Sequence, residues 1–245
     1  MPGTEPARGP ARALPLLLAC ISALANLSFL AEGLVGSRLP WGTSLVSELS
    51  AVGQPGAWVF RAGDITQGLT GLLLVVPLAR RWGWRGVAGW TLVTAALLYA
   101  AGTLVQALVP EPCSPTLDPS CHPDTGILDL LGHGATSVIA AAAAIGSLVG
   151  LTVIHLRPGL LPAWRPPRHR LLLAALAATL AVVVLGSGLT EIVWSLFPVE
   201  IPALGTLQRL QLACLSGWTL WLGVLAVAPR QPGAAHASSP GDERL

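Results

Sequence analysis

The chain has 245 residues, of which 53% are hydrophobic and only 11% are charged, and its mean hydropathy is +0.66. Several apolar stretches reach the roughly 20 residues needed to cross about 30 Å of hydrocarbon, which excludes an ordinary soluble domain. The formal net charge is only +2 and the basic residues are dispersed, which excludes nucleic acid as a partner. We therefore predict an all-α fold, a polytopic membrane helical bundle.

Six transmembrane helices are predicted, and Pro, Gly and Arg residues separate them. They cover Ala13 to Gly36, Ile65 to Ala79, Val87 to Val109, Leu128 to Leu156, Leu171 to Phe197 and Ala203 to Ala228. The second span is short unless it begins near Ala62. Together they form one membrane domain, residues 13–228, between an N-terminal segment of residues 1–12 and a tail of residues 229–245, whose Pro, Gly, Ser and charged residues predict disorder.

The first span has a competing interpretation as a cleaved signal peptide. Its sequence ARGPARALPLLLACISALA has a basic start, a short apolar stretch and an Ala23-Leu24-Ala25 sequence that signal peptidase could recognise. Residues 17–20 also loosely resemble a lipoprotein lipobox ending at Cys20. The apolar run nevertheless continues to Val35, so a retained transmembrane helix is predicted.

The distribution of arginine orients the spans, because cytoplasmic loops of membrane proteins are enriched in basic residues. All fourteen basic residues are Arg, and a cytoplasmic N-terminus places eleven of them on the cytoplasmic side. The three others, Arg38, Arg61 and Arg209, then fall toward the outside. Both termini are therefore expected in the cytoplasm.

Ionisable side chains inside spans are the main functional signal, because an ionised group in hydrocarbon is costly unless it is paired or faces water. Four such positions are predicted at similar depth on the outer side: Asp64, His133, Glu191 and Arg209. Asp64 follows Arg61 by three residues, so these two side chains could share one helical face. The hydroxyl group of Ser137 is predicted on the same helical face as His133.

Glu191 and Arg209 are predicted to form an ion pair, because they lie at matching depths in two spans that a short loop joins. Glu32 in the first span lies at comparable depth and could join them. Such a pair either holds the helices together or belongs to a functional site, and the sequence leaves both interpretations open.

Cys113 and Cys121 lie in the Pro-rich outer loop PEPCSPTLDPSCHPDTG. In an oxidising compartment, two Cys eight positions apart predict a disulfide. The alternative is a metal site that adds His122 and His133, but the CxxC spacing typical of such sites is missing. Neither a metal ion nor another cofactor is predicted.

SLVSELSAVGQPGAWVFRAGD, followed by GLTGLLLV, a Cys-containing loop and HGATSVIAA, resembles the bacterial membrane family known as domain of unknown function 998. The resemblance covers roughly residues 14–197. It implies a multi-pass protein of the bacterial cell (inner) membrane, and it marks as family-like the positions Ser47, Glu48, Leu49, Gly53, Pro55 and His133. It implies an architecture but no activity.

These features predict a polar site at the outer mouth of the bundle that binds or processes a membrane lipid or another hydrophobic small molecule. The candidates for acid–base chemistry are Glu48, Asp64, His133 and Glu191, because desolvation suits a carboxyl group to general acid work. The candidates for substrate binding are Arg61, Arg209, Ser47, Ser137, Trp58 and Trp194. A turn at Gly53 to Gly56 would fold the loop back and bring Glu48 toward Arg61 and Asp64.

Other functions stay open. A membrane terpene cyclase would use a protonated carboxylic acid to start cyclisation of an isoprenoid in an apolar cavity. A non-catalytic scaffold or sensor would bind another envelope protein through its outer loops. A small transporter is disfavoured, because the chain has no evident inverted repeat and no charge in the inner halves of its spans. Whether the protein is an enzyme is not decided by the sequence.

Overall fold

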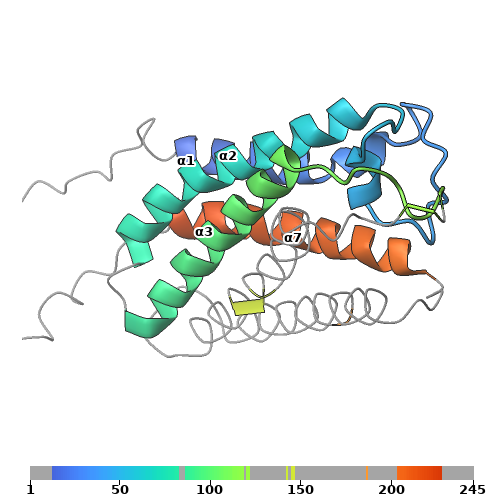
Figure 1. Ribbon diagram of the computed structural model, residues 1–245. Coiled ribbons are helices and arrows are strands. Elements are labelled where there is room, and N and C mark those ends of the chain that lie inside the picture. Colours follow the sequence, from blue (N-terminus) through green and yellow to red (C-terminus); the bar gives the residue numbers. More distant parts are fainter. Residues whose placement is uncertain are drawn as a thin grey trace, which may run out of the picture.

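A computed structural model describes residues 13–82, 86–118, 120–121 and 203–227, together with the isolated positions 142, 145, 146 and 186. The described part of the chain is helical (Figure 1). Its elements are α1 (Ala13–Asn26), the 3-10 turns η2 (Ser28–Ala31) and η3 (Ser47–Ser50), α2 (Ala57–Trp82), α3 (Gly86–Leu108) and α7 (Leu204–Val227).

Three of these helices are long and apolar enough to cross a membrane. They are α2 with 26 residues, α3 with 23 and α7 with 24, and α1 is a shorter apolar helix of 14 residues. The third and sixth predicted spans agree with α3 and α7 to within a residue or two at each end. The predicted spans 128–156 and 171–197, and both termini, lie outside the described residues.

Two predicted boundaries were wrong. Helix α2 begins at Ala57 rather than Ile65. Its first turns contain the buried Phe60 and the charged residues Arg61 and Asp64, and a hydropathy pattern alone assigns such charged residues to a loop. The first predicted span is an α-helix only as far as Asn26. The amide of Asn26 is hydrogen-bonded to α7, and the chain then continues through the 3-10 turn η2.

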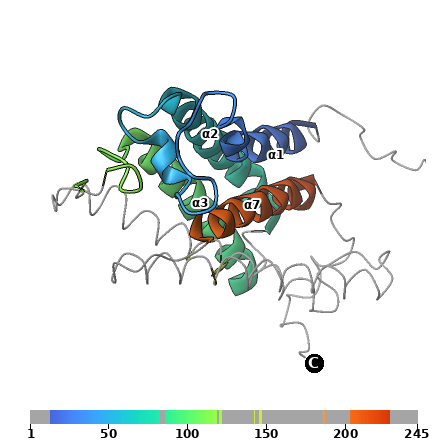
Figure 2. The same ribbon diagram turned by 90° about the vertical axis from the view of Figure 1, so that its right-hand side faces the viewer.

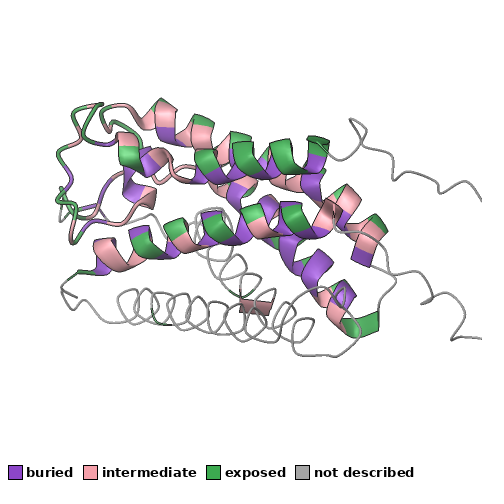
Figure 3. Ribbon diagram, turned by 180° about the vertical axis from the view of Figure 1, so that it is seen from behind, coloured by how far each residue is buried: buried purple, intermediate pink, exposed green. Residues whose placement is uncertain are grey.

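Among the described helices, α2 packs against α1, α3 and α7, and α1 also packs against α7 (Figures 1 and 2). Figure 3 shows buried and exposed residues alternating around each helix, as expected where one stripe of a helix faces its neighbours. Trp82, the last residue of α2, is buried against α7, and its indole Nε1 donates to the Leu225 carbonyl at 3.1 Å.

Small residues allow the helices to approach closely, which is the usual mode of helix association in membranes. Gly223 on α7 is one such case: a Cβ added there would lie 2.5 Å from the Ala19 Cβ and 3.2 Å from the Pro15 carbonyl oxygen of α1. Gly217, on the same helix, has no atom of the described residues within 4 Å of the position its Cβ would take.

We expect Gly223→Ala to lower the free energy of unfolding by about 1–3 kcal/mol, because the added methyl group must push α1 and α7 apart. Gly217→Ala is the matched control, and it should leave stability unchanged or raise it by up to about 1 kcal/mol through helix propensity. Unfolding in detergent, followed by circular dichroism, measures both. Equal stability of the two variants would contradict the close α1–α7 contact.

Candidate functional site

Two loops cover one end of the bundle, where α1 and α3 end and α2 and α7 begin (Figures 1 and 2). We call them together the cap: residues 37–56 and the described residues of 110–121. The Val52 amide donates to the Glu111 carbonyl at 2.9 Å and joins the two loops. The Thr206 amide at the start of α7 donates to the Gly42 carbonyl at 3.2 Å, so the cap is attached to the helices as well.

The predicted turn is present in the first loop. Gly53 and Gly56 have φ values of +84° and +69°, which L-residues with side chains rarely adopt, so glycine is needed at both positions. The turn reverses the chain so that the preceding residues lie along the first turns of α2. There the Nε of Arg61 donates to the Ser50 carbonyl at 2.9 Å, and this bond fixes the arginine side chain.

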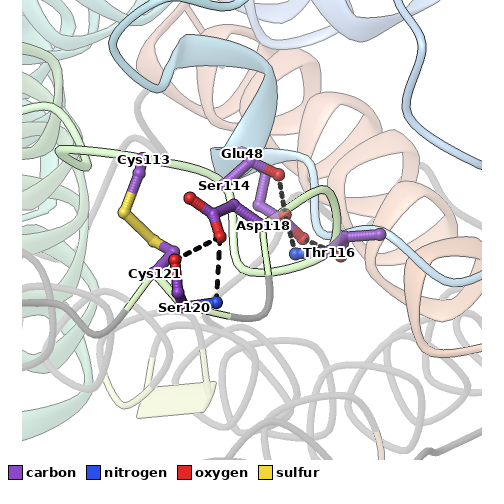
Figure 4. The surroundings of a disulfide bond; sticks show 7 residues. All are labelled: Glu48, Cys113, Ser114, Thr116, Asp118, Ser120 and Cys121. Carbon is purple, nitrogen blue, oxygen red and sulfur yellow. Dashed lines mark hydrogen bonds between the residues drawn. A yellow bond between two sulfur atoms is a disulfide. The ribbon is translucent and has the colours of Figure 1, made fainter.

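Glu48 is the most enclosed charged residue of the cap, with only 1% of its surface exposed. Its carboxylate accepts from the Leu45 amide at 3.0 Å, and from the amide and hydroxyl groups of Thr116 at 3.0 Å and 2.7 Å. It also accepts a short hydrogen bond from the Ser114 hydroxyl group (Figure 4). These four hydrogen bonds come from residues of both loops, so the Glu48 carboxylate connects the two loops of the cap.

The predicted disulfide between Cys113 and Cys121 is confirmed, with a Cα–Cα distance of 6.0 Å. It closes the short segment that contains Ser114 and Thr116, the two residues that bind Glu48 (Figure 4). Within this segment Asp118 accepts from the Ser120 amide at 2.9 Å and its hydroxyl at 2.6 Å. Because the two sulfur atoms are joined in a disulfide, neither is a thiolate that could bind a metal ion.

Beneath the cap lies a buried ion pair between Arg209 of α7 and Glu32, which follows η2. The Nη2 of Arg209 donates to Glu32 Oε2 at 2.8 Å, and its Nε to Glu32 Oε1 at 3.1 Å. This is the bidentate arrangement that a guanidinium group favours. The sequence predicted Glu191 as the main partner and Glu32 as an additional one; Glu32 is the partner found, and Glu191 lies outside the described residues.

The remaining contacts of Arg209 are also internal, and the residue is only 2% exposed. Its Nη1 donates to the Ser44 carbonyl at 2.9 Å and the Gly205 carbonyl at 3.1 Å. The Trp41 ring lies 5.0 Å from the centre of the guanidinium group, within cation–π range. Arg209 therefore ties the cap to α7 and η2, and it does not present an open site for an anion.

A polar cluster lies deeper, between the helices. The Asn26 amide nitrogen donates to the Leu212 carbonyl at 2.8 Å and the Ser216 hydroxyl oxygen at 2.9 Å, and the Tyr99 hydroxyl donates to Asn26 Oδ1 at 3.4 Å. Beside it is a cavity of about 20 Å³, whose polar lining includes Ser22, Gln67, Tyr99 and Thr219. That volume has room for about one water molecule.

The other predicted site residues fall into two groups. Trp58 is 75% exposed on the first turn of α2, Asp64 is half-buried one turn after Arg61, and Ser47 is half-buried at the start of η3. The structure thus brings Trp58, Arg61 and Asp64 onto one stretch of α2 at the cap. His133, Ser137, Glu191 and Trp194 lie outside the described residues.

Sequence reasoning missed several residues that build this end of the protein. Ser114 and Thr116 were not predicted, although a disulfide between Cys113 and Cys121 would hold their hydroxyl groups close to the residues that the loop packs against. Asn26 was not among the predicted site residues, although a polar amide in an apolar run needs hydrogen-bond partners. Trp41 was not predicted to contact Arg209, and no local pattern indicates that contact.

Comparison with known proteins places the chain in a family. No curated protein and no solved structure matches it. The family model described as "Protein of unknown function (DUF998)" matches residues 18–225, which include every helix described above except the first residues of α1 and the last of α7. This agrees with the resemblance in the Ser47–Asp64 region and the three helices able to span a membrane. The chain therefore belongs to the DUF998 family of proteins of unknown function.

Proposed function

We propose that the protein binds an amphiphile with an anionic headgroup, such as an acidic phospholipid, at the cap end of its bundle. The contacts are assigned to Trp58 and Arg61 on the first turns of α2. With the topology predicted from arginine distribution, this site faces the outer leaflet of a bacterial cell membrane. The ligand's apolar part would lie along the exposed apolar surface of the neighbouring helices.

The observation that carries the proposal is the placement of Trp58 and Arg61 three residues apart on one side of α2. Trp58 is exposed and Arg61 is half-buried, with its Nε held by the Ser50 carbonyl. Tryptophan favours the headgroup level of a bilayer, and a guanidinium group binds phosphate through its planar array of donors. A cation held in position beside an interfacial tryptophan suits an anionic headgroup above acyl chains.

Binding is favoured over acid–base chemistry at this site. Glu48 is enclosed by four hydrogen-bond donors, and Arg209 is enclosed by Glu32 and two backbone carbonyls, so neither side chain is available to a substrate. The cavity beside Tyr99 has room for about one water molecule, so it is far too small for an isoprenoid. The described helices therefore give no support to a terpene cyclase, and His133 and Glu191 stay candidates from the sequence alone.

Lipids that copurify with the full-length protein test the proposal. Mass spectrometry of lipids extracted after detergent purification should find an anionic amphiphile enriched over the bulk membrane. Arg61→Gln should lower that enrichment roughly tenfold, which is the effect of losing about 1.4 kcal/mol of headgroup interaction. Arg61→Lys, which keeps the charge but loses the planar donor array, should retain part of it.

Arg38→Gln is the matched control, because Arg38 is an exposed arginine of the same cap and the substitution changes net charge equally. It should leave the lipid content as in the wild type. Identical lipid content in the wild type, Arg61→Gln and Arg38→Gln, with all three equally stable to heat, would refute the proposed site.

A further inference from the structure

We propose that the Cys113–Cys121 disulfide is a latch whose redox state controls the position of Arg61 through Glu48. This deepens the ligand site proposed above and rests on it for its functional consequence. Oxidised, the disulfide holds the cap closed around Glu48. Reduced, it releases the loop that supplies most of the hydrogen bonds to Glu48, and the cap loosens around Arg61.

The first link joins the disulfide to Glu48. Three of the four hydrogen bonds to this carboxylate come from Ser114 and Thr116, which lie between the two linked cysteines (Figure 4). A disulfide around so short a segment greatly restricts the conformations it can adopt, and opening it restores that freedom. Forming the three bonds then costs the conformational entropy of ordering the open segment. The fourth bond, from the Leu45 amide three residues before Glu48, does not depend on the disulfide.

The second link joins Glu48 to Arg61. Glu48 and Ser50 belong to the same four-residue 3-10 turn, η3, which is too short to be stable without tertiary contacts. The Ser50 carbonyl at the end of this turn accepts the hydrogen bond from Arg61 Nε at 2.9 Å. Loss of the Glu48 bonds therefore weakens the hold on η3, which then rests on the burial of Leu49 and on the backbone contacts of Ser44 and Val52, and loosens the acceptor that orients the guanidinium group.

The chemistry is a thiol–disulfide exchange with a dithiol as the reductant. A thiolate of the dithiol attacks one sulfur of the Cys113–Cys121 bond, and its second thiol resolves the mixed disulfide. The protein gains two electrons and two protons as two cysteine thiols, and the dithiol leaves as a disulfide. The other cysteines, Cys20 and Cys214, are already thiols and do not take part.

Hydrogen exchange tests the latch on the full-length protein in phosphatidylcholine nanodiscs, where no anionic lipid is needed. The Leu45 and Thr116 amides donate directly to Glu48 and report its contacts. Treatment with dithiothreitol should speed their exchange about tenfold or more, corresponding to at least 1.4 kcal/mol less protection. Peptides from the middle of α2 should be unchanged.

Two variants complete the test. In the double variant Cys113→Ser with Cys121→Ser, the Leu45 and Thr116 amides should exchange as fast as in the reduced wild type, and dithiothreitol should not change their rates. Glu48→Gln should exchange faster than the wild type while the disulfide is intact. Equal exchange at Leu45 and Thr116 in oxidised and reduced protein, with reduction verified by alkylation and mass, overturns the latch.

Retention of phosphatidylglycerol separates the latch from the proposed function. Oxidised wild type should retain this lipid and reduced wild type should lose most of it. If the oxidised protein retains none, the proposed function fails, and the exchange measurement alone then decides the latch. If retention is the same in both states although exchange has risen, the link from Glu48 to Arg61 is refuted.

Discussion

Glu48→Ala is expected to lower the free energy of unfolding by about 3–5 kcal/mol, the range found when one partner of a buried charged contact is removed. The substitution leaves four donors from Leu45, Ser114 and Thr116 without their acceptor inside the cap. Glu48→Gln keeps the shape but turns an amide N–H₂ group toward these donors, so an intermediate loss is expected. Thermal unfolding of the purified protein in detergent measures both.

Ser47→Ala is the control for Glu48, because Ser47 lies in the same 3-10 turn and is half-buried. Its effect should stay within about 0.5 kcal/mol of wild type. A Glu48→Ala protein as stable as the wild type would show that the four hydrogen bonds contribute nothing. Glu48 would then be better explained as an acid or base in a reaction.

Arg209→Met is expected to be as damaging, about 3–5 kcal/mol, because it leaves the Glu32 carboxylate buried without its cation. Combining it with Glu32→Met should recover much of the loss, since two apolar side chains replace the pair. Arg209→Lys should not rescue stability, because an ammonium group cannot reproduce the two parallel bonds to Glu32 and the bonds to two carbonyls.

A double-mutant cycle on the same unfolding assay isolates the interaction of Glu32 with Arg209. The coupling free energy should lie at or above the upper part of the usual range, about 3 kcal/mol. Strict additivity of the two single substitutions would mean that the pair does not hold the cap to the bundle, and that each side chain acts through other neighbours.

The sequence predicted what depends on local pattern. Long apolar runs gave the positions of α3 and α7, two cysteines in a Pro-rich loop gave the disulfide, and two glycines gave the turn before α2. The start of α2 was harder to predict, because a hydropathy pattern assigns charged residues such as Arg61 and Asp64 to a loop. At a bilayer boundary such side chains reach polar surroundings while their backbone stays helical.

Long-range pairing is what the sequence could not supply. Glu32 and Arg209 are 177 positions apart, and Glu48 and Thr116 are 68 apart. Several acidic residues were at a suitable depth for Arg209, and depth alone cannot rank them. The Glu48 contacts depend on how the disulfide loop folds over η3. The carboxylate that the sequence marks as a candidate acid is also the acceptor that joins the two loops of the cap.

The most direct test of ligand binding at the cap is native mass spectrometry of the protein in nanodiscs that contain phosphatidylglycerol and phosphatidylcholine. Oxidised wild type should bind phosphatidylglycerol at least roughly tenfold more tightly than Arg61→Gln, which is a difference of about 1.4 kcal/mol. Glycerol 3-phosphate, which has the headgroup charge but no acyl chains, should not displace it. Equal binding by wild type and Arg61→Gln, or full displacement by glycerol 3-phosphate, would contradict an amphiphile site at Trp58 and Arg61.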